Sequence, residues 1–307
     1  MQDRDHIQVF ESARPSLLGL AYRMLGSMAD AEDAVQDTFL KWSLADRSKI
    51  ENGAAWLSTT CTRRCVDLLR AAHRSRVNYV GAWLPEPIHT PVDSDVDAKL
   101  DLATSLSTAF LLMLERLTPK ERAAYLLHEI FDHSYREISE TLDADEAACR
   151  KLVSRARANI GRDTVRQTVS VEHQDRLLAA FQNAVATGAT AQLATLLSDD
   201  VRLRADGGGK VLAALNVLHG PDRVLAFVAK GLRKYWADFR WQTAELNGAR
   251  GLVLEHQGVT AAAVSFGYDA AGKASDIYIV RNPDKLRNLS TTASGLRPWR
   301  IAKLGQR

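Results

Sequence analysis

Three short helical segments follow one another between Thr118 and Gly161, and this arrangement constrains the fold more than any other stretch of the chain. Residues 118–121 (Thr-Pro-Lys-Glu) and 134–137 (Ser-Tyr-Arg-Glu) have the form of capping boxes, in which a hydroxyl and a glutamate satisfy free amides at a helix start. Asp145 is placed to cap a third helix that continues to about Gly161. The spacing predicts a short helix, a tight turn and a longer helix.

The third of these helices has two different faces when its residues are placed at 100° intervals. One face is apolar, with Cys149, Leu152, Val153, Ala156 and Ile160. The opposite face is basic and polar, with Arg150, Lys151, Ser154, Arg155 and Arg157. This pattern is typical of a helix-turn-helix whose second helix enters the major groove of DNA. A three-helix bundle with a solvated basic face is the alternative.

The chain has 307 residues, which favours two or three domains. A formal net charge of +3 is too small to indicate nucleic acid by itself, but the charges are segregated. Residues 63–76 contain five arginines and one aspartate, and residues 150–166 contain six basic residues and one aspartate. Acidic residues concentrate at 30–37 and 93–101. Two basic stretches separated by acidic ones are consistent with two contacts to a polyanion.

The three cysteines, Cys61, Cys65 and Cys149, all fit apolar helix faces and are expected to be reduced. Cys61 and Cys65 are four residues apart and could share a metal, but no histidine or second cysteine pair lies nearby, so packing in the core is favoured. We expect no metal and no cofactor. Because no run of about 18 apolar residues occurs, the chain is expected to be soluble and cytoplasmic, without membrane contact.

The first part of the chain, to about residue 76, is predicted to be all helical. A helix that begins near Asp30 has an acidic outer face with Glu32, Asp33, Gln36 and Asp37. A later helix has an outer face with Thr59, Arg63, Asp67, Arg70 and Arg74. One face suits a protein partner and the other suits DNA. The alternative is that the two charged faces solvate each other.

The residues at 20–27 (Leu-Ala-Tyr-Arg-Met-Leu-Gly-Ser), 30–40 and 67–70 resemble region 2 of bacterial RNA polymerase sigma factors. The predicted helix-turn-helix resembles region 4 of the same family. Only about 27 residues separate the two regions, which is too short for the region 3 domain of housekeeping sigma factors. The resemblance therefore places the chain in the extracytoplasmic function group.

The resemblance implies core RNA polymerase and promoter DNA as partners. It assigns polymerase binding to the acidic face, through Asp33, Gln36 and Asp37. It assigns the −10 element to the following loop and helix, through residues 44–52, Arg63, Asp67 and Arg70, with Arg63 in a place where relatives often have Asn. It assigns the −35 element to Arg150, Lys151, Ser154, Arg155 and Arg157.

The spacer, Val77 to Leu100, contains Trp-Leu-Pro-Glu-Pro at residues 83–87. It is predicted to be an extended tether in which this one motif binds another surface. This motif resembles a signature of the subgroup that has a SnoaL-like C-terminal domain. Residues 206–210 (Asp-Gly-Gly-Gly-Lys) and 282–286 (Asn-Pro-Asp-Lys-Leu) resemble its two other signatures. For a regulatory contact within the chain, the candidates are Trp83, Leu84, Pro85, Asp206, Lys210, Asn282 and Asp284.

The predicted fold is multidomain. Two all-α sigma domains, a region 2 helical bundle (1–76) and a region 4 helix-turn-helix (104–165), are separated by a linker (77–103). An α+β SnoaL-like cone domain (170–289) and a mobile basic tail (290–307) follow. In the cone domain, helices at 174–197 and 222–235 precede strands near 239–243, 252–254, 259–268 and 276–280.

Residues 206–210 do not form a phosphate-binding loop, because Val211 follows the lysine and the required glycine spacing is absent. Cone folds include isomerases with an aspartate base, but no second titratable group has a recognisable position here, so no catalytic residue is expected. The predicted function is a sigma factor controlled by its own C-terminal domain. The alternative is a DNA-binding regulator whose C-terminal domain senses a ligand or resembles an isomerase.

Overall fold

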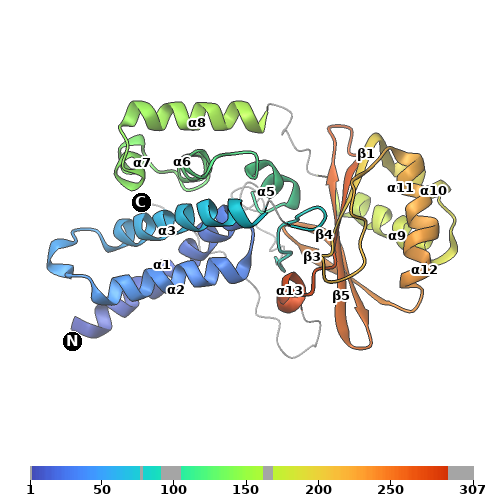
Figure 1. Ribbon diagram of the computed structural model, residues 1–307, viewed down its shortest axis with the longest axis horizontal. Helices are drawn as coiled ribbons and strands as arrows, with labels where there is room; N and C mark the ends of the chain where they lie inside the picture. Colours follow the sequence, from blue (N-terminus) through green and yellow to red (C-terminus); the bar gives the residue numbers. More distant parts are fainter. Residues whose placement is uncertain (1, 77–78, 91–104, 162–168, 290–307) are drawn as a thin grey trace. The chain divides into compact units, whose positions relative to one another are not determined.

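The computed structural model describes residues 2–76, 79–90, 105–161 and 169–289 (Figure 1). Within these ranges the chain divides into two compact units. The helical unit comprises residues 2–76 and 113–161, and the C-terminal unit comprises residues 79–90, 105–112 and 169–289. Among the helices of these ranges, none combines the length and hydropathy that a bilayer crossing requires.

The first half of the helical unit consists of α1 (Gln2–Leu25), α2 (Met28–Leu44), the short 3-10 helix η1 (Arg47–Lys49) and α3 (Gly53–Arg76). The hydroxyl of Ser27 accepts a hydrogen bond from the amide of Asp30 and caps α2. The indole of Trp42 donates to the carbonyl of His6 over 2.9 Å. Cys61 and Cys65 are fully buried on α3, as expected for cysteines that pack in a core.

The second half of the helical unit contains α6 (Pro119–Glu129), α7 (Tyr135–Leu142) and α8 (Glu146–Ile160). Both predicted capping boxes are present, at the starts of α6 and α7. Asp143 ends α7 with a left-handed backbone (φ 50°), and the side chain of Asp145 accepts from the amide of Ala148 over 2.6 Å. The predicted helix-turn-helix is therefore confirmed.

The C-terminal unit is built on a six-stranded mixed sheet. Its strands are β1 (Leu197–Asp206), β2 (Leu218–His219), β3 (Arg240–Leu246), β4 (Ala249–His256), β5 (Val259–Tyr268) and β6 (Ala274–Val280). They are arranged in the order β2-β1-β6-β5-β4-β3. The β1 and β6 strands pair in parallel, and every other pair is antiparallel. The fold is therefore α+β, as predicted.

Helices cover one face of this sheet (Figure 1). They are α9 (Val171–Thr187), α10 (Ala191–Leu196), α11 (Pro221–Ala226), the π-helix η3 (Phe227–Leu232) and α12 (Arg233–Trp236). Their core includes alternate strand residues such as Leu252, Leu254, Ile277 and Ile279. Because successive strand residues point to opposite faces, the residues between these face the other side.

The second face of the sheet has a core of its own. Val253, Ala263, Tyr278 and Val280 pack there against Leu84, which precedes the sheet by more than a hundred residues. The remaining cover comes from α5 (Thr108–Leu114), α13 (Pro283–Leu286) and the 3-10 helix η4 (Arg287–Leu289). The domain is thus a sheet between two apolar layers, one of which includes part of the linker.

Three features differ from the sequence prediction. The strand β1 was not predicted, although Val201, Leu203 and Ala205 alternate with two arginines. The helix predicted at 222–235 is interrupted by η3. Of the predicted tether, residues 79–90 are packed into the C-terminal unit, while residues 91–104 lie outside the described ranges. The predicted tail, 290–307, also lies outside them.

Candidate functional site

The basic face of α8 carries all five residues that were predicted to contact the −35 element, and each is exposed: Arg150, Lys151, Ser154, Arg155 and Arg157. The opposite face is anchored by Cys149, Val153 and Ala156, whose side chains are inaccessible to solvent. The amphipathic pattern therefore fixes which side of the helix is presented.

Two of these basic residues are already paired. Arg150 forms an ion pair with Glu146 at 2.8 Å, and its guanidinium lies 4.9 Å from the centre of the Tyr135 ring. Arg157 donates to Glu129 through Nε and Nη2, and this hydrogen bond raises the pKa of Arg157. In the described part of the chain, no ion pair involves Lys151 or Arg155. These two cations are the most available to a phosphate or a base.

The acidic face of α2 presents the residues predicted to bind polymerase. Asp33 and Gln36 are exposed, whereas Asp37 is partly covered. Asp37 forms an ion pair of 2.7 Å with Arg64 on α3. Arg64 does not belong to the predicted basic face of α3, so this pair does not join the two charged faces. Asp33 and Gln36 remain open to a partner.

The residues predicted to contact the −10 element, Arg63, Asp67 and Arg70, lie together on α3. Asp67 and Arg70 form an exposed ion pair at 3.4 Å. Arg63 donates from Nε to the carbonyl of Thr141 over 2.9 Å and from Nη2 to the carbonyl of Glu140 over 2.7 Å. It therefore satisfies carbonyls that the end of α7 leaves without partners inside the helix.

This joint between α3 and α7 has further polar contacts. The hydroxyls of Thr59 and Thr141 are 3.0 Å apart. A polar groove of about 530 Å³ runs beside them. It is lined by Arg63, Val66, Asp67, Arg70, Lys120, Thr141, Leu142 and Asp143. The buried Arg122 of α6 adds a second connection, because it donates to the carbonyl of Met24 over 2.6 Å. The DNA-binding candidates on α3 thus face α6 and α7 in this structure.

In the C-terminal unit, Asp206 at the end of β1 is fully buried and lies at the centre of a polar network. Its Oδ2 accepts from the amide of Leu84 over 2.9 Å and from Nζ of Lys285 over 2.7 Å. Its Oδ1 accepts from the hydroxyl of Tyr79 over 2.6 Å and from the amide of Gly208 over 3.0 Å. Four donors therefore satisfy this buried carboxylate.

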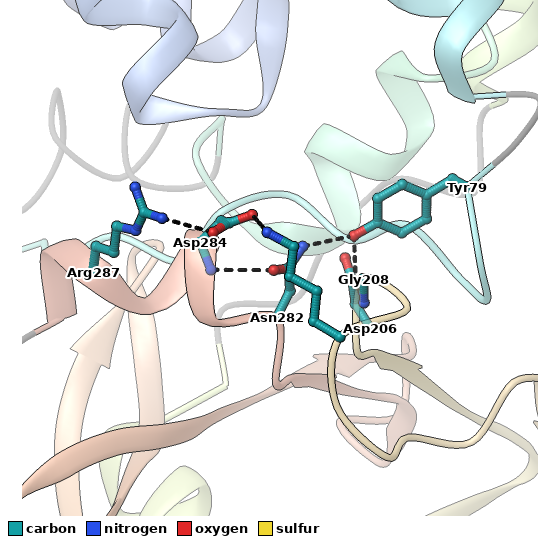
Figure 2. A network of polar contacts seen from close by, with 7 residues as sticks. Tyr79, Asp206, Gly208, Asn282, Asp284 and Arg287 are labelled. Atoms are coloured by element: carbon teal, nitrogen blue, oxygen red, sulfur yellow. Dashed lines mark hydrogen bonds and ion pairs between the residues drawn. The ribbon is translucent and has the colours of Figure 1, made fainter.

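Lys285 and Asn282 extend the network from the start of α13. Nζ of Lys285 donates to the carbonyl of Leu84 over 2.5 Å and lies 4.4 Å from the centre of the Trp83 ring. The amide of Asn282 donates to the hydroxyl of Tyr79 over 3.0 Å (Figure 2). The linker is consequently held through both its backbone and its aromatic side chains.

The outer part of the network is ionic and exposed. Asp284 pairs with Lys210 and with Arg287, the latter at 2.8 Å, and Figure 2 shows the contact with Arg287. The hydrogen bond from Lys210 lowers the pKa of Asp284. Deeper in the cluster, burial and the hydrogen bond to Asp206 raise the pKa of Tyr79, so that its hydroxyl remains a donor.

The glycine run between Asp206 and Lys210 allows the close approach that the cluster needs. Gly208 has a φ of 60°, and a Cβ atom there would lie 2.3 Å from the side-chain amide nitrogen of Asn282. Only glycine fits this position, because any other residue would combine a strained backbone with a clash. The run makes a tight turn, as the sequence predicted.

The linker is attached at a second point, on the hairpin between β3 and β4. Asn247 is buried, and its backbone amide donates to the carbonyl of Ile88 over 3.0 Å. Its side-chain amide donates to the carbonyl of Leu106, which follows the linker, over 3.0 Å. The amide of Thr90 donates to the carbonyl of Glu245 over 3.1 Å. Residues 79–90 therefore extend along the sheet from the Asp206 cluster to its far edge.

The structure brings the seven predicted regulatory residues to one region of the C-terminal unit: Trp83, Leu84, Pro85, Asp206, Lys210, Asn282 and Asp284. The sequence analysis missed Tyr79, Lys285 and Asn247. Lys285 is part of the 282–286 motif, and Asn247 begins an Asn-Gly pair typical of hairpins, so both had a detectable signal. Within the described residues, no group of three potential metal ligands occurs.

Comparisons with known proteins agree with this geometry. The family models for Sigma-70 region 2 and Sigma-70 region 4 match residues 9–75 and 107–160. The chain is 32% identical over 318 residues to the ECF RNA polymerase sigma factor SigJ of Mycobacterium tuberculosis, covering 98% of this chain and 97% of the relative.

Two further similarities extend the comparison. The crystal structure of Mycobacterium tuberculosis SigJ superposes with a TM-score of 0.72 at 30% identity, over 92% of this chain and 98% of that one. The chain is also 32% identical to the probable ECF sigma factor SigI of Mycobacterium tuberculosis, over 69% of this chain and 71% of the relative. The similarity to SigJ therefore extends through the C-terminal unit.

Proposed function

Because the chain belongs to the extracytoplasmic function family of RNA polymerase sigma factors, we propose that its C-terminal unit controls sigma activity by holding the linker between regions 2 and 4. The chain is a sigma factor, which acts in promoter recognition and transcription initiation. The observation that carries the proposal is the buried carboxylate of Asp206, which accepts the backbone amide of Leu84 in the linker.

The physical effect of this attachment is a loss of conformational freedom. A free linker can vary its end-to-end distance and direction, whereas residues 79–90 are held in one path along the sheet. A sigma factor must place one region on the −10 element and the other on the −35 element. A linker held against the C-terminal unit limits the arrangements in which both contacts form.

The individual surfaces have the roles that their positions suggest. Asp33, Gln36 and Asp37 bind core RNA polymerase, and Arg63, Asp67 and Arg70 contact the −10 element. The basic face of α8 contacts the −35 element, with Lys151 and Arg155 as the cations that need no prior release. Arg63 first has to leave the carbonyls at the end of α7, so contact with the −10 element requires the joint between α3 and α7 to open.

The C-terminal unit has no catalytic role in this proposal. Both oxygens of Asp206 are occupied by donors, so this carboxylate is unsuited to abstract a proton. An apolar pocket on the helical side of the sheet, lined by residues such as Ala205, Phe227 and Ile279, has no carboxylate among its described lining residues. The unit acts through the chain segment that it binds.

The test compares two buried aspartates of the same sheet. Asp206→Asn weakens the hold on the linker, whereas Asp276→Asn removes a buried carboxylate that pairs with Arg202 and Arg204. Transcription is measured with purified core polymerase and a mapped promoter, and limited proteolysis measures how accessible the linker is. Tyr79→Phe provides a milder variant, because it removes one hydroxyl of the cluster and leaves the charges in place.

We expect Asp206→Asn and Tyr79→Phe to increase cleavage within the linker and to raise transcription several-fold. Asp276→Asn should change neither, although it also removes a buried charge. If the two aspartate variants behave alike, the effect is general destabilisation and control through the linker is excluded. Equal transcription by wild type, Tyr79→Phe and Asp206→Asn would also contradict the proposal.

A further inference from the structure

A separate apolar pocket of about 190 Å³ lies on the helical side of the sheet in the C-terminal unit. It is bounded by β1 and β6, by the loop after residue 210, and by η3 and α12. The residues that form its walls include Ala205, Ala214, Phe227, Leu232, Tyr235 and Ile279. An engineered cavity of about 150 Å³ binds benzene, so the volume is sufficient for one ring with a short substituent.

The pocket coincides with the irregular helix of the unit. Phe227–Leu232 forms a π-helix, a rare conformation that is often found at functional sites. Gly231 lies on this helix, and a Cβ atom there would come within 3.0 Å of the Phe227 ring. The absence of a side chain at residue 231 thus leaves the Phe227 ring its place in the pocket wall.

Two buried side-chain nitrogens without a hydrogen-bond partner in the described part of the chain lie in this largely apolar wall. Trp236 is 1% exposed, and among the described residues none accepts a hydrogen bond from its indole N–H. Arg281 donates from Nη1 to the carbonyl of Leu212 over 2.6 Å, while its buried Nε has no acceptor within the described ranges. No ion pair of the described residues involves Arg281, so its positive charge is not balanced by a carboxylate. Burial lowers its pKa.

We infer that this pocket binds a small aromatic carboxylic acid, whose ring enters the apolar chamber and whose carboxylate pairs with Arg281. An aromatic ring suits the volume and the apolar character of the walls, and the carboxylate supplies the acceptor that Nε of Arg281 lacks among the described residues. A cationic ligand is excluded by the charge of Arg281. A neutral apolar ligand would fill the chamber but leave the buried Nε of Arg281 without an acceptor.

The position of the pocket connects it to the linker cluster through the backbone. Ala205 forms part of the wall and directly precedes Asp206, and the amide of Arg281 donates to the carbonyl of Asp206 over 2.7 Å. A ligand that moves Arg281 therefore acts on the residue next to Asn282. The binding test below is independent of whether the linker controls transcription.

The experiment measures binding to the full-length protein by calorimetry with two matched probes, 3-phenylpropionate and 3-phenylpropanol. The two differ in the carboxylate, so the proposal expects the acid to bind about tenfold more tightly. Arg281→Gln should abolish this difference by weakening binding of the acid alone. Arg240→Gln is the matched control, because this arginine is 74% exposed on the same sheet and does not line the pocket.

A second measurement places the ligand in the pocket. In NMR spectra of nitrogen-15-labelled protein, the indole N–H signal of Trp236 is the one that Trp236→Phe removes. This signal should shift on addition of 3-phenylpropionate. Ala214→Phe, which fills the pocket, should remove both the shift of the indole signal and the heat of binding in calorimetry. No binding of the acid at millimolar concentration would overturn the inference. Equal affinity for acid and alcohol, or binding that survives Ala214→Phe, would overturn it too.

Discussion

The polar residues of the helical unit and those of the C-terminal unit are used in opposite ways. On α8, Lys151 and Arg155 are exposed and carry no ion pair within the described residues, whereas Asp206 and Lys285 are buried and bonded to each other. An exposed charge can bind a partner without disturbing the fold, but a buried charge has to be satisfied inside it. Charged motifs of similar appearance in sequence are therefore exposed to solvent in one unit and paired internally in the other.

The largest expected effect comes from Lys285→Met, which leaves Asp206 without its buried cation. Breaking a buried pair by removing one partner costs about 3 to 5 kcal/mol, and we expect a loss of this size in the unfolding free energy of the C-terminal unit. Lys210→Met is the control, because the Lys210–Asp284 pair is exposed and should contribute less than about 1 kcal/mol. Urea unfolding measures both. Equal losses would show that the cluster is no more than a surface network.

The next effect concerns the acidic face of α2. Reversing Asp33 and Asp37 to lysine should weaken binding to core polymerase by on the order of 3 kcal/mol, because like charges at an interface repel. The reversal also breaks the Asp37–Arg64 pair, so Arg64→Ala, which breaks the same pair and keeps the acidic face, is the control. Binding is measured with purified core enzyme at fixed salt. Wild-type affinity in the double reversal would count against polymerase binding by this face.

A smaller effect is expected from Lys151→Ala and Arg155→Ala on α8. If the side chain contacts a base, its removal should cost about 1 to 3 kcal/mol of promoter binding and relax the preference at one base pair. If the side chain contacts a phosphate, its removal should weaken binding to all DNA sequences alike and reduce the salt dependence of binding by about one ion. Neither variant should lower the unfolding free energy, because both side chains are exposed. Arg14→Ala, at an exposed position of α1, should leave promoter affinity unchanged.

The smallest effect is a pH dependence of the linker attachment. His89 forms a bridge to Leu246, and burial lowers its pKa from 6.5. Since the unfolded chain binds the proton more readily, stability is fully present above pH 6.5 and falls as the pH drops towards the lower folded pKa. The free energy of unfolding should be higher at pH 8 than at pH 5, and His89→Gln should reduce this difference by less than about 1 kcal/mol. The same change at exposed His219 should leave that difference in place; if it does not, the assignment to His89 is wrong.

Local signals in the sequence were sufficient for the helical unit. The caps at Thr118, Ser134 and Asp145 depend on residues within three positions of one another, so the starts of α6, α7 and α8 could be read directly. The exposed face of α8 followed from periodicity alone. What periodicity could not show is that Arg63 binds the end of α7, because that contact joins residues 78 positions apart.

In the C-terminal unit the important contacts are distant in sequence. The bond between Leu84 and Asp206 spans 122 positions, and only the resemblance of the motifs pointed to it. The strand β1 was missed because it opens with Ser198, Asp199 and Asp200, which are poor strand residues, before its alternation begins. The π-helix was missed because its contacts depart from the regular helical period. The apolar pocket therefore had no signature in the sequence.

The second apolar layer of the sheet makes linker release sensitive to temperature. Leu84 covers a surface formed by Val253, Ala263, Tyr278 and Val280, and its removal would hydrate that surface. Exposure of apolar area increases heat capacity, and the attraction between apolar groups weakens on cooling. The free energy that retains the linker is therefore curved with temperature, and cold loosens the same contact that moderate warming strengthens.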